Sequence, residues 1–232
     1  RAGGAKYPRA HRPTDGSAIG PEVIRVLWKA AKDRKMDVRT QTRATEIIMK
    51  DGRVAGVKAT TKDGKVYTID AKAVVLATGG FGANQDMLVK YQPKLKGYAT
   101  TNQPGATGDG IILAEHAGAA LVDMKQIQAH PTAAPDGTLI SESVRGDGGI
   151  LINAEGKRFT NELLTRDVVS AAELKQPGRF AWVFWDDATR KSAKLMDSYI
   201  SMGLAVKGNT VAEIAKAMNV PAAELEATLK AY

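Results

Sequence analysis

Apolar residues recur at helical spacing in three stretches of the chain. In residues 21–35 (PEVIRVLWKAAKDRK) they fall on one face of a helix, and the proline at the start suits the first helical turn. Residues 210–220 and 221–232 show the same spacing, with threonine and proline at their respective starts. A further helix is expected over residues 109–121, after a glycine-containing loop. The sequence therefore predicts helices near both ends of the chain and in its middle.

Short runs of β-branched and apolar residues predict the strands. Residues 42–70 contain the pairs Asp51-Gly52 and Asp63-Gly64, which are typical of hairpin turns. Residues 73–80 (AVVLATGG) form an apolar run that enters a glycine turn, as a buried strand does. Further strands are expected over residues 138–143, over residues 148–159 with a turn at Glu155-Gly156, and from residue 180, where a helix follows the strand. The class is therefore α/β, with helices and strands mixed throughout.

Composition narrows the possible functions. The 232 residues suffice for one large domain or two small ones, and 44% apolar content supports a packed core. No apolar run approaches the roughly 18 residues of a membrane helix, and no signal peptide is evident. Because the chain begins at Arg1, we interpret it as a processed or truncated piece. The absence of cysteine excludes disulfides, thiolate metal sites, thiol catalysis and covalent c-type haem attachment within the chain.

The net charge of +8 suggests an anionic partner. Nucleic-acid binders usually cluster their basic residues and interleave them with aromatic ones. Here the basic residues are spread along the chain and aromatic residues make up only 6%. The pattern argues against nucleic acid and leaves a membrane surface or a small anionic ligand as the partner that the charge suggests.

Two glycine-rich turns are candidates for cofactor contact. The turn at residues 77–80 follows the expected buried strand, where glycines let a ligand approach the backbone, although it could also be a simple tight turn. Asp109 precedes a helix, where it could be an ordinary N-cap or lie beside a polar cofactor edge. The chain contains no GxGxxG motif, so a segment that binds a nucleotide pyrophosphate would have to lie upstream of Arg1.

Five motifs occur in an order that resembles a known family. VVLATGGFG, TNQPGATGDG, QAHPT, RGDGGILIN and TRD together resemble the flavoprotein subunit of the soluble fumarate reductases of flavocytochrome c type, relatives of succinate dehydrogenase. The resemblance implies part of a Rossmann-like FAD-binding domain in residues 1–123 and a mobile capping, or clamp, domain in residues 124–232. Both would be truncated, because the family's N-terminal GxGxxG segment and its C-terminal segment with a further histidine and arginine are missing.

The resemblance also implies a cofactor. FAD would be bound non-covalently, and any haem would belong to a segment that this chain does not contain. The glycine turn would lie against FAD, and the start of the strand at residue 42 would contact its adenosine end. The expected cofactor-binding residues are Ala44, Thr78, Gly79, Gly80, Asn102 and Asp109.

The implied chemistry is the reduction of an unsaturated acid. Arg166 would donate the proton, and Glu142 and Arg145 would form the proton pathway behind it. His130 would bind a substrate carboxylate, and Ser141 stands where the family has a threonine. On the expected strand over residues 138–143, Glu142 would face away from its serine neighbours. The expected substrate-binding residues are His130, Thr132, Ser141 and Glu142, and the expected catalytic residues are Arg166, Glu142 and Arg145.

Each of these residues also has a structural interpretation. Glu142 and Arg145 could be a surface ion pair worth under about 1 kcal/mol. Arg166 could instead pair with Asp167 or Glu162, and a lone histidine such as His130 is often a structural, hydrogen-bonded residue.

The resemblance makes an FAD-dependent fumarate reductase the leading hypothesis. One alternative is a related enoate reductase acting on urocanate or an acrylate-like acid, and another is a non-catalytic fragment or partner-binding module. The expected partners are a small dicarboxylate and an electron-donating cytochrome or haem domain, with no nucleic acid and no membrane insertion. The resemblance implies the periplasm, with the cytoplasm as the alternative location.

Overall fold

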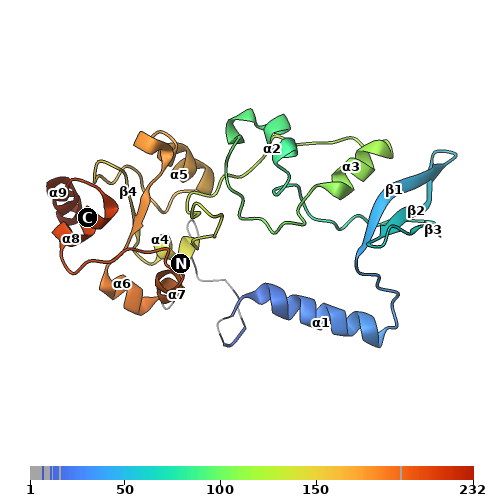
Figure 1. Ribbon diagram of the computed structural model, residues 1–232, viewed down its shortest axis with the longest axis horizontal. Helices are drawn as coiled ribbons and strands as arrows, with labels where there is room; N and C mark the ends of the chain where they lie inside the picture. Colours follow the sequence, from blue (N-terminus) through green and yellow to red (C-terminus); the bar gives the residue numbers. More distant parts are fainter. Residues whose placement is uncertain (1–6, 8–10, 12, 16, 194) are drawn as a thin grey trace. The chain divides into compact units, whose positions relative to one another are not determined.

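The computed structural model describes residues 7, 11, 13–15, 17–193 and 195–232 (Figure 1). They divide into two compact units, a first unit within residues 10–126 and a second unit formed by Tyr7 and residues 127–232. Both units contain helices and strands, so the predicted mixed α/β class is confirmed. The division into an FAD-binding and a capping domain after Asp123 stays a prediction.

The first unit contains one long helix and a three-stranded antiparallel sheet in the order β1-β2-β3 (Figure 1). Both predicted hairpins are confirmed. Asp51 and Gly52 have φ values of 51° and 74°, the left-handed conformation that a two-residue hairpin turn requires. The helix and strands are α1 (Ile19–Asp33), β1 (Thr42–Lys50), β2 (Arg53–Thr61) and β3 (Val66–Asp70).

Two short helices and a 3₁₀ turn complete the first unit. Asn84 caps α2 by accepting a hydrogen bond from the Met87 amide at 3.0 Å. The helix predicted over residues 109–121 ends early, because the chain leaves the helix at Ala117 and Gly118 adopts a φ of 93°. These elements are α2 (Gln85–Tyr91), η1 (Pro93–Leu95) and α3 (Asp109–His116).

The buried strand predicted over residues 73–80 is wrong for this structure. The segment has no regular secondary structure, and Val75 is 89% exposed. A strand of the fully buried kind needs neighbouring strands on both sides to pair with its backbone. Among the described residues, no strand pairs with this segment.

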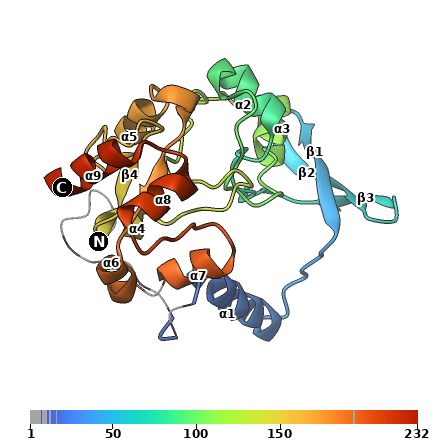
Figure 2. The ribbon, with the colours of Figure 1, turned by 60° about the vertical axis from the view of Figure 1, so that its left-hand side comes forward.

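The second unit is built on a short antiparallel pair, β4 with β5, in which Leu151 lies opposite Val183. Its main core joins this pair to α8 and α9, which lie side by side (Figures 1 and 2). The residues buried there are Ile150, Ile152, Ala215, Met218, Val220 and Leu225. The elements are α4 (Glu142–Gly146), β4 (Ile150–Ile152), α5 (Arg166–Glu173), η2 (Pro177–Arg179), β5 (Trp182–Phe184), α6 (Asp187–Ser192), α7 (Leu195–Ser201), α8 (Val211–Met218) and α9 (Ala222–Ala231).

The predicted strand, helix start and C-terminal helices from residue 180 onward are confirmed as β5, α6, α8 and α9. Two other predictions need correction. The strand over residues 138–143 is wrong, because Ser141 begins a helix: its Oγ accepts a hydrogen bond from the Ser143 amide at 3.3 Å. The long hairpin over residues 148–159 is reduced to β4, a turn at Gly156 and a single bridge, since β4 pairs mainly with β5.

Candidate functional site

Two groups of candidate residues form, one in each unit. In the first unit, the glycine turn near residue 80 is bound to the loop before α3. The Gly108 amide donates to the Gly80 carbonyl at 3.1 Å, and the Thr100 hydroxyl donates to the Gly82 carbonyl at 2.7 Å. We call residues 78–82 and 100–110, with the start of β1, the glycine-loop cluster.

Close packing explains why glycine occupies two positions of this cluster. A Cβ atom on Gly110 would lie 2.1 Å from the Thr78 hydroxyl, and one on Gly82 would lie 2.3 Å from the Asn102 side-chain nitrogen. Gly79, by contrast, has a φ of 75° and no heavy atom within 4 Å of where its Cβ would be. The backbone there is open to a ligand.

Asp109 joins the cluster to β1. It is the first residue of α3 rather than its N-cap, which is Gly108. Its carboxylate accepts hydrogen bonds from the Thr107 hydroxyl at 2.8 Å and from Arg43 Nε at 2.9 Å. The Thr107 hydroxyl lowers the pKa of Asp109, and Arg43 adds to the effect. Arg43 precedes Ala44, so this contact brings the start of β1 to the start of α3.

The structure thus gathers the expected cofactor-binding residues in one region of the first unit. Glycine turns with an open backbone, a helix N-terminus and a fixed carboxylate fit the FAD that the resemblance implies. These residues would hold the polar edges of FAD. Their individual contacts with the cofactor stay predictions.

The second group is an acid–arginine cluster, which we define as Glu142, Arg145 and Arg166. Arg166 forms a two-pronged hydrogen bond with Glu142, from Nε at 2.6 Å and from Nη2 at 2.9 Å. Arg145 Nη2 lies 3.5 Å from the same carboxylate. Glu142 therefore lies between two guanidinium groups, and Arg166, followed by Arg145, lowers its pKa. The alternative pairings of Arg166 with Asp167 or Glu162 are not the ones formed.

Short helices position these three side chains. Glu142 and Arg145 are three residues apart on α4, so they face the same side. The start of α4 is fixed by Tyr199, whose hydroxyl accepts a hydrogen bond from the Ser141 amide at 2.8 Å. Arg166 is the first residue of α5.

Arg145 is the most deeply placed member of the cluster. Its side chain is fully buried, and Nη1 donates to the Glu162 carbonyl at 2.6 Å. Burial lowers its pKa, while Glu142 and Glu162 act in the opposite direction. The interpretation of Glu142 and Arg145 as a surface ion pair is therefore wrong.

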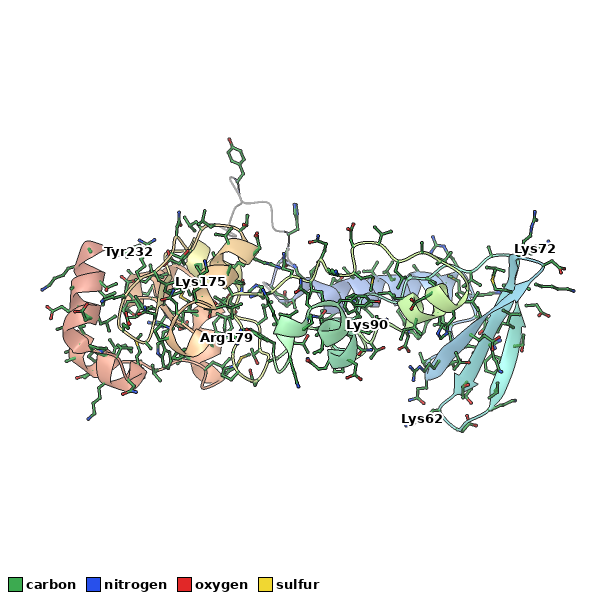
Figure 3. All side chains as sticks on the ribbon, turned by 90° about the horizontal axis from the view of Figure 1, so that it is seen from above. Lys62, Lys72, Lys90, Lys175, Arg179 and Tyr232 are labelled. Carbon is green, nitrogen blue, oxygen red and sulfur yellow. The ribbon has the colours of Figure 1, made fainter. Side chains whose placement is uncertain are left out.

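Glu162 is itself held in place. Arg158 donates hydrogen bonds from Nε and Nη2 to the buried Glu162 carboxylate, and the Leu151 amide donates to the same carboxylate at 2.9 Å. The Arg158 guanidinium lies 4.9 Å from the ring centre of Tyr232, which follows α9 (labelled in Figure 3). The carbonyl that receives Arg145 is thus anchored to the core of the unit.

His130 lies close to this cluster. It is half-buried, and its pKa is lowered by burial and then by the positive charge of Arg166. The Thr132 amide donates to His130 Nδ1 at 3.2 Å, so the neutral ring carries its proton on Nε2. Arg166 also donates from Nη1 to Gln128 at 2.8 Å, which links α5 to the segment that bears His130.

Thr132 and Ser141 mainly serve the local structure. The Thr132 hydroxyl donates to the Ile140 carbonyl at 2.7 Å and is buried. The Ser141 hydroxyl caps α4 and lies 3.0 Å from the Ser143 hydroxyl. Their contact with a substrate stays a prediction, but both belong to the same unit as His130 and Arg166.

The sequence alone did not single out several residues of this site. Arg43, Gln128 and Tyr199 act through contacts with distant segments, and no local pattern marks them. Arg158 pairs with Glu162 only four residues away.

Within the part of the chain that the structure describes, no helix has the length and apolar character to cross a membrane. The same residues include no group of three metal-binding side chains close enough to hold an ion.

Comparison with known proteins gives a consistent result. A family model described as FAD binding domain matches residues 1–232. The chain is 45% identical to a fumarate reductase (cytochrome) of Shewanella frigidimarina, over 99% of this chain and 41% of that protein. It is 36% identical to a urocanate reductase of Eggerthella lenta, over 92% of this chain and 38% of that protein.

A solved structure agrees. The open conformation of a flavocytochrome c3 fumarate reductase superposes on this chain with a TM-score of 0.81 and 43% identity, over 100% of this chain and 42% of that one. The chain therefore spans about two fifths of the length of these relatives.

Proposed function

Because the chain belongs to the FAD binding domain family, we propose that the protein containing it is an FAD-dependent reductase of an unsaturated carboxylate, with fumarate as substrate and succinate as product. The observation that carries the proposal is the acid–arginine cluster beside His130. Two arginines share one carboxylate there, and one of them, Arg166, keeps a partly exposed guanidinium.

This arrangement suits the chemistry of an activated alkene. Reduction of fumarate adds a hydride to one alkene carbon and a proton to the other, and reduced FAD, when bound, supplies the hydride. The chain's own residues must bind carboxylates and deliver the proton. Arginine and a histidine Nε2–H are fixed donors for carboxylate oxygens, and an arginine fork also sets the orientation of the substrate.

Arg166 would donate the proton. An arginine is a very weak acid, with a pKa above about 12, so it can act only on a strongly basic, carbanion-like carbon. Glu142 raises the pKa of Arg166 through its hydrogen bonds, which keeps the donor charged until such a carbon forms. The same carboxylate then lies in position to return a proton to Arg166.

Fumarate is favoured by the relative named fumarate reductase, which is 45% identical to this chain. The relative named urocanate reductase supports a second candidate substrate, urocanate, at 36% identity. The electron donor would be a cytochrome or an attached haem domain, as the name of the first relative suggests. A periplasmic location also stays a prediction, which fractionation of the host cell tests.

The test uses the protein expressed from its complete reading frame. The purified protein is expected to show the visible spectrum of bound flavin and, with a reduced dye as artificial donor, to reduce fumarate faster than urocanate or acrylate. Flavin without reduction of any of the three acids would contradict the proposal. A folded, colourless protein would favour the partner-binding module instead.

A further inference from the structure

Ser170 is a buried polar residue that the proposed mechanism does not use. It lies on α5 (Figure 1), one helical turn after Arg166 and on the same face, and it is only 5% exposed. A serine within a helix often bonds to the carbonyl of the preceding turn. The Ser170 hydroxyl instead donates to the Ala129 carbonyl at 3.1 Å, 41 residues away in the chain. This hydrogen bond joins α5 to the residue that precedes His130.

His130 thus lies between two anchored residues. Ala129, on one side, is bound to α5. Thr132, on the other side, donates from its amide to His130 Nδ1 at 3.2 Å, and its buried hydroxyl donates to the Ile140 carbonyl at 2.7 Å, shortly before α4. The imidazole is therefore placed with respect to both helices that carry the acid–arginine cluster.

Two contacts from one face of α5 hold the segment before His130. Arg166 donates from Nη1 to the Gln128 side chain at 2.8 Å, and Ser170 donates to the Ala129 carbonyl. The first contact joins two long side chains that are partly open to solvent. The second runs from a short, buried side chain to the backbone, so it loses less conformational freedom and fixes the spacing more firmly.

This spacing matters because the proposed reaction needs His130 and Arg166 to act on one substrate molecule. His130 would hold a carboxylate while Arg166 gives a proton to an alkene carbon of the same acid. A displacement of about 1 Å in such an arrangement can lower the rate about 10²-fold. The distance between the two residues is therefore a property that the fold has to fix.

We propose that Ser170 is a positioning residue, whose hydroxyl sets the spacing between His130 and Arg166. This inference rests on the proposed function. Ser170 acts through the Ala129 backbone on the imidazole of His130 and has no role in the transfer of the proton itself. Without the hydroxyl, the substrate would still bind but would be misaligned with the proton donor.

The test is the Ser170→Ala variant of the protein expressed from its complete reading frame. The change removes one hydroxyl and adds no bulk, so kcat/KM is expected to fall about tenfold or more through lost alignment. Thr228→Val is the matched control, because the Thr228 hydroxyl donates to the Gly156 carbonyl at 2.8 Å and ties α9 to a turn outside the acid–arginine cluster. The control should lose thermal stability as Ser170→Ala does and keep the kcat/KM of the wild type.

A double-mutant cycle separates positioning from a general loss of stability. His130→Ala keeps the proton donor and hence a residual turnover. If Ser170 acts through His130, adding Ser170→Ala to this variant should lower kcat/KM no further. A decrease by the same factor with and without His130 would overturn the positioning role.

The other outcomes are equally distinct. A Ser170→Ala variant with the kcat/KM of the wild type would overturn the positioning role and leave the proposed function intact. A wild-type protein that reduces none of the three acids would overturn both. If Ser170→Ala fails to fold, Ser170→Cys decides, because a thiol has a similar shape and is only a weak donor. A reduced kcat/KM that the His130→Ala background abolishes supports the role, and any other result overturns it.

Discussion

The two units differ in how completely they cover their own apolar residues. The second unit buries two hydrophobic clusters, around Leu225 and around Met196. In the first unit α1 has no buried residue, and its apolar side chains are exposed, Ile24 by 65% and Leu27 by 60%. Exposed apolar surface of this extent usually marks a contact face.

This difference matters for the two candidate sites. The acid–arginine cluster rests on a framework that the second unit completes by itself, since Glu162 is tied to β4 through the Leu151 amide. The glycine-loop cluster is held by hydrogen bonds between loops, such as that between Gly108 and Gly80. We therefore expect the acid–arginine cluster to be preorganised without a ligand, and the geometry of the glycine-loop cluster to depend more on the ligand that binds to it.

The largest effect should come from Arg166→Ala in the protein expressed from its complete reading frame. The change removes both the proton and a charge that stabilises the transition state, so kcat should fall at least about 10³-fold. Flavin content should stay normal, because the expected FAD contacts belong to the other unit. Turnover and flavin absorbance measure the two effects, with Arg53→Ala, an exposed arginine at a hairpin, as the control. Turnover close to the wild type would refute the role of Arg166.

The contrast between the cores can be tested directly by leucine truncation. Leu225→Ala should lower the free energy of unfolding by about 2–5 kcal/mol, because the side chain is fully buried. Leu27→Ala on α1 should change it by less than about 0.5 kcal/mol. Chemical denaturation of the 232-residue chain measures both. Equal losses of unfolding free energy in the two variants would mean that the apolar face of α1 is buried in solution. The two units would then not differ in how completely they cover their apolar residues.

Gly110→Ala probes the packing of the glycine-loop cluster. The new methyl group would collide with the Thr78 hydroxyl at 2.1 Å, which should cost about 1–3 kcal/mol and weaken flavin binding accordingly. Adding Thr78→Ala should relieve the collision and recover part of the loss. Gly20→Ala is a suitable control, because no heavy atom lies within 4 Å of its Cβ position. Flavin release on dilution gives the comparison.

Local features of the fold were predictable from the sequence, and features that depend on distant partners were not. The hairpin at Asp51-Gly52 follows from two adjacent residues that tolerate positive φ. The apolar run at residues 73–80 cannot specify a strand without neighbours. Residues 138–140 are β-branched or apolar and favour a strand, but the Ser141 side chain caps a helix instead.

The candidate site likewise combines contacts that the local sequence predicts with contacts that depend on distant segments. Glu142 and Arg145 are neighbours because they lie one helical turn apart, which the sequence could indicate once α4 is known. The pairing of Arg166 with Glu142 spans 24 residues and came only from the family resemblance. The burial of Arg145 depends on the Glu162 carbonyl and its anchors, which no short motif encodes.

The smallest expected effect concerns the two ion pairs that support these clusters. Arg43 is 72% exposed in its pair with Asp109, so Arg43→Ala should cost under about 1 kcal/mol of stability and less at high salt. Arg158→Ala should cost more, because it leaves the buried Glu162 carboxylate without its cation. Thermal unfolding of both variants at low and high salt provides the measurement. If Arg43→Ala lowered the stability more than Arg158→Ala, polar contacts would contribute more to the stability of the first unit than to that of the second. The hydrogen bonds between its loops would then be the main interactions that hold the first unit together.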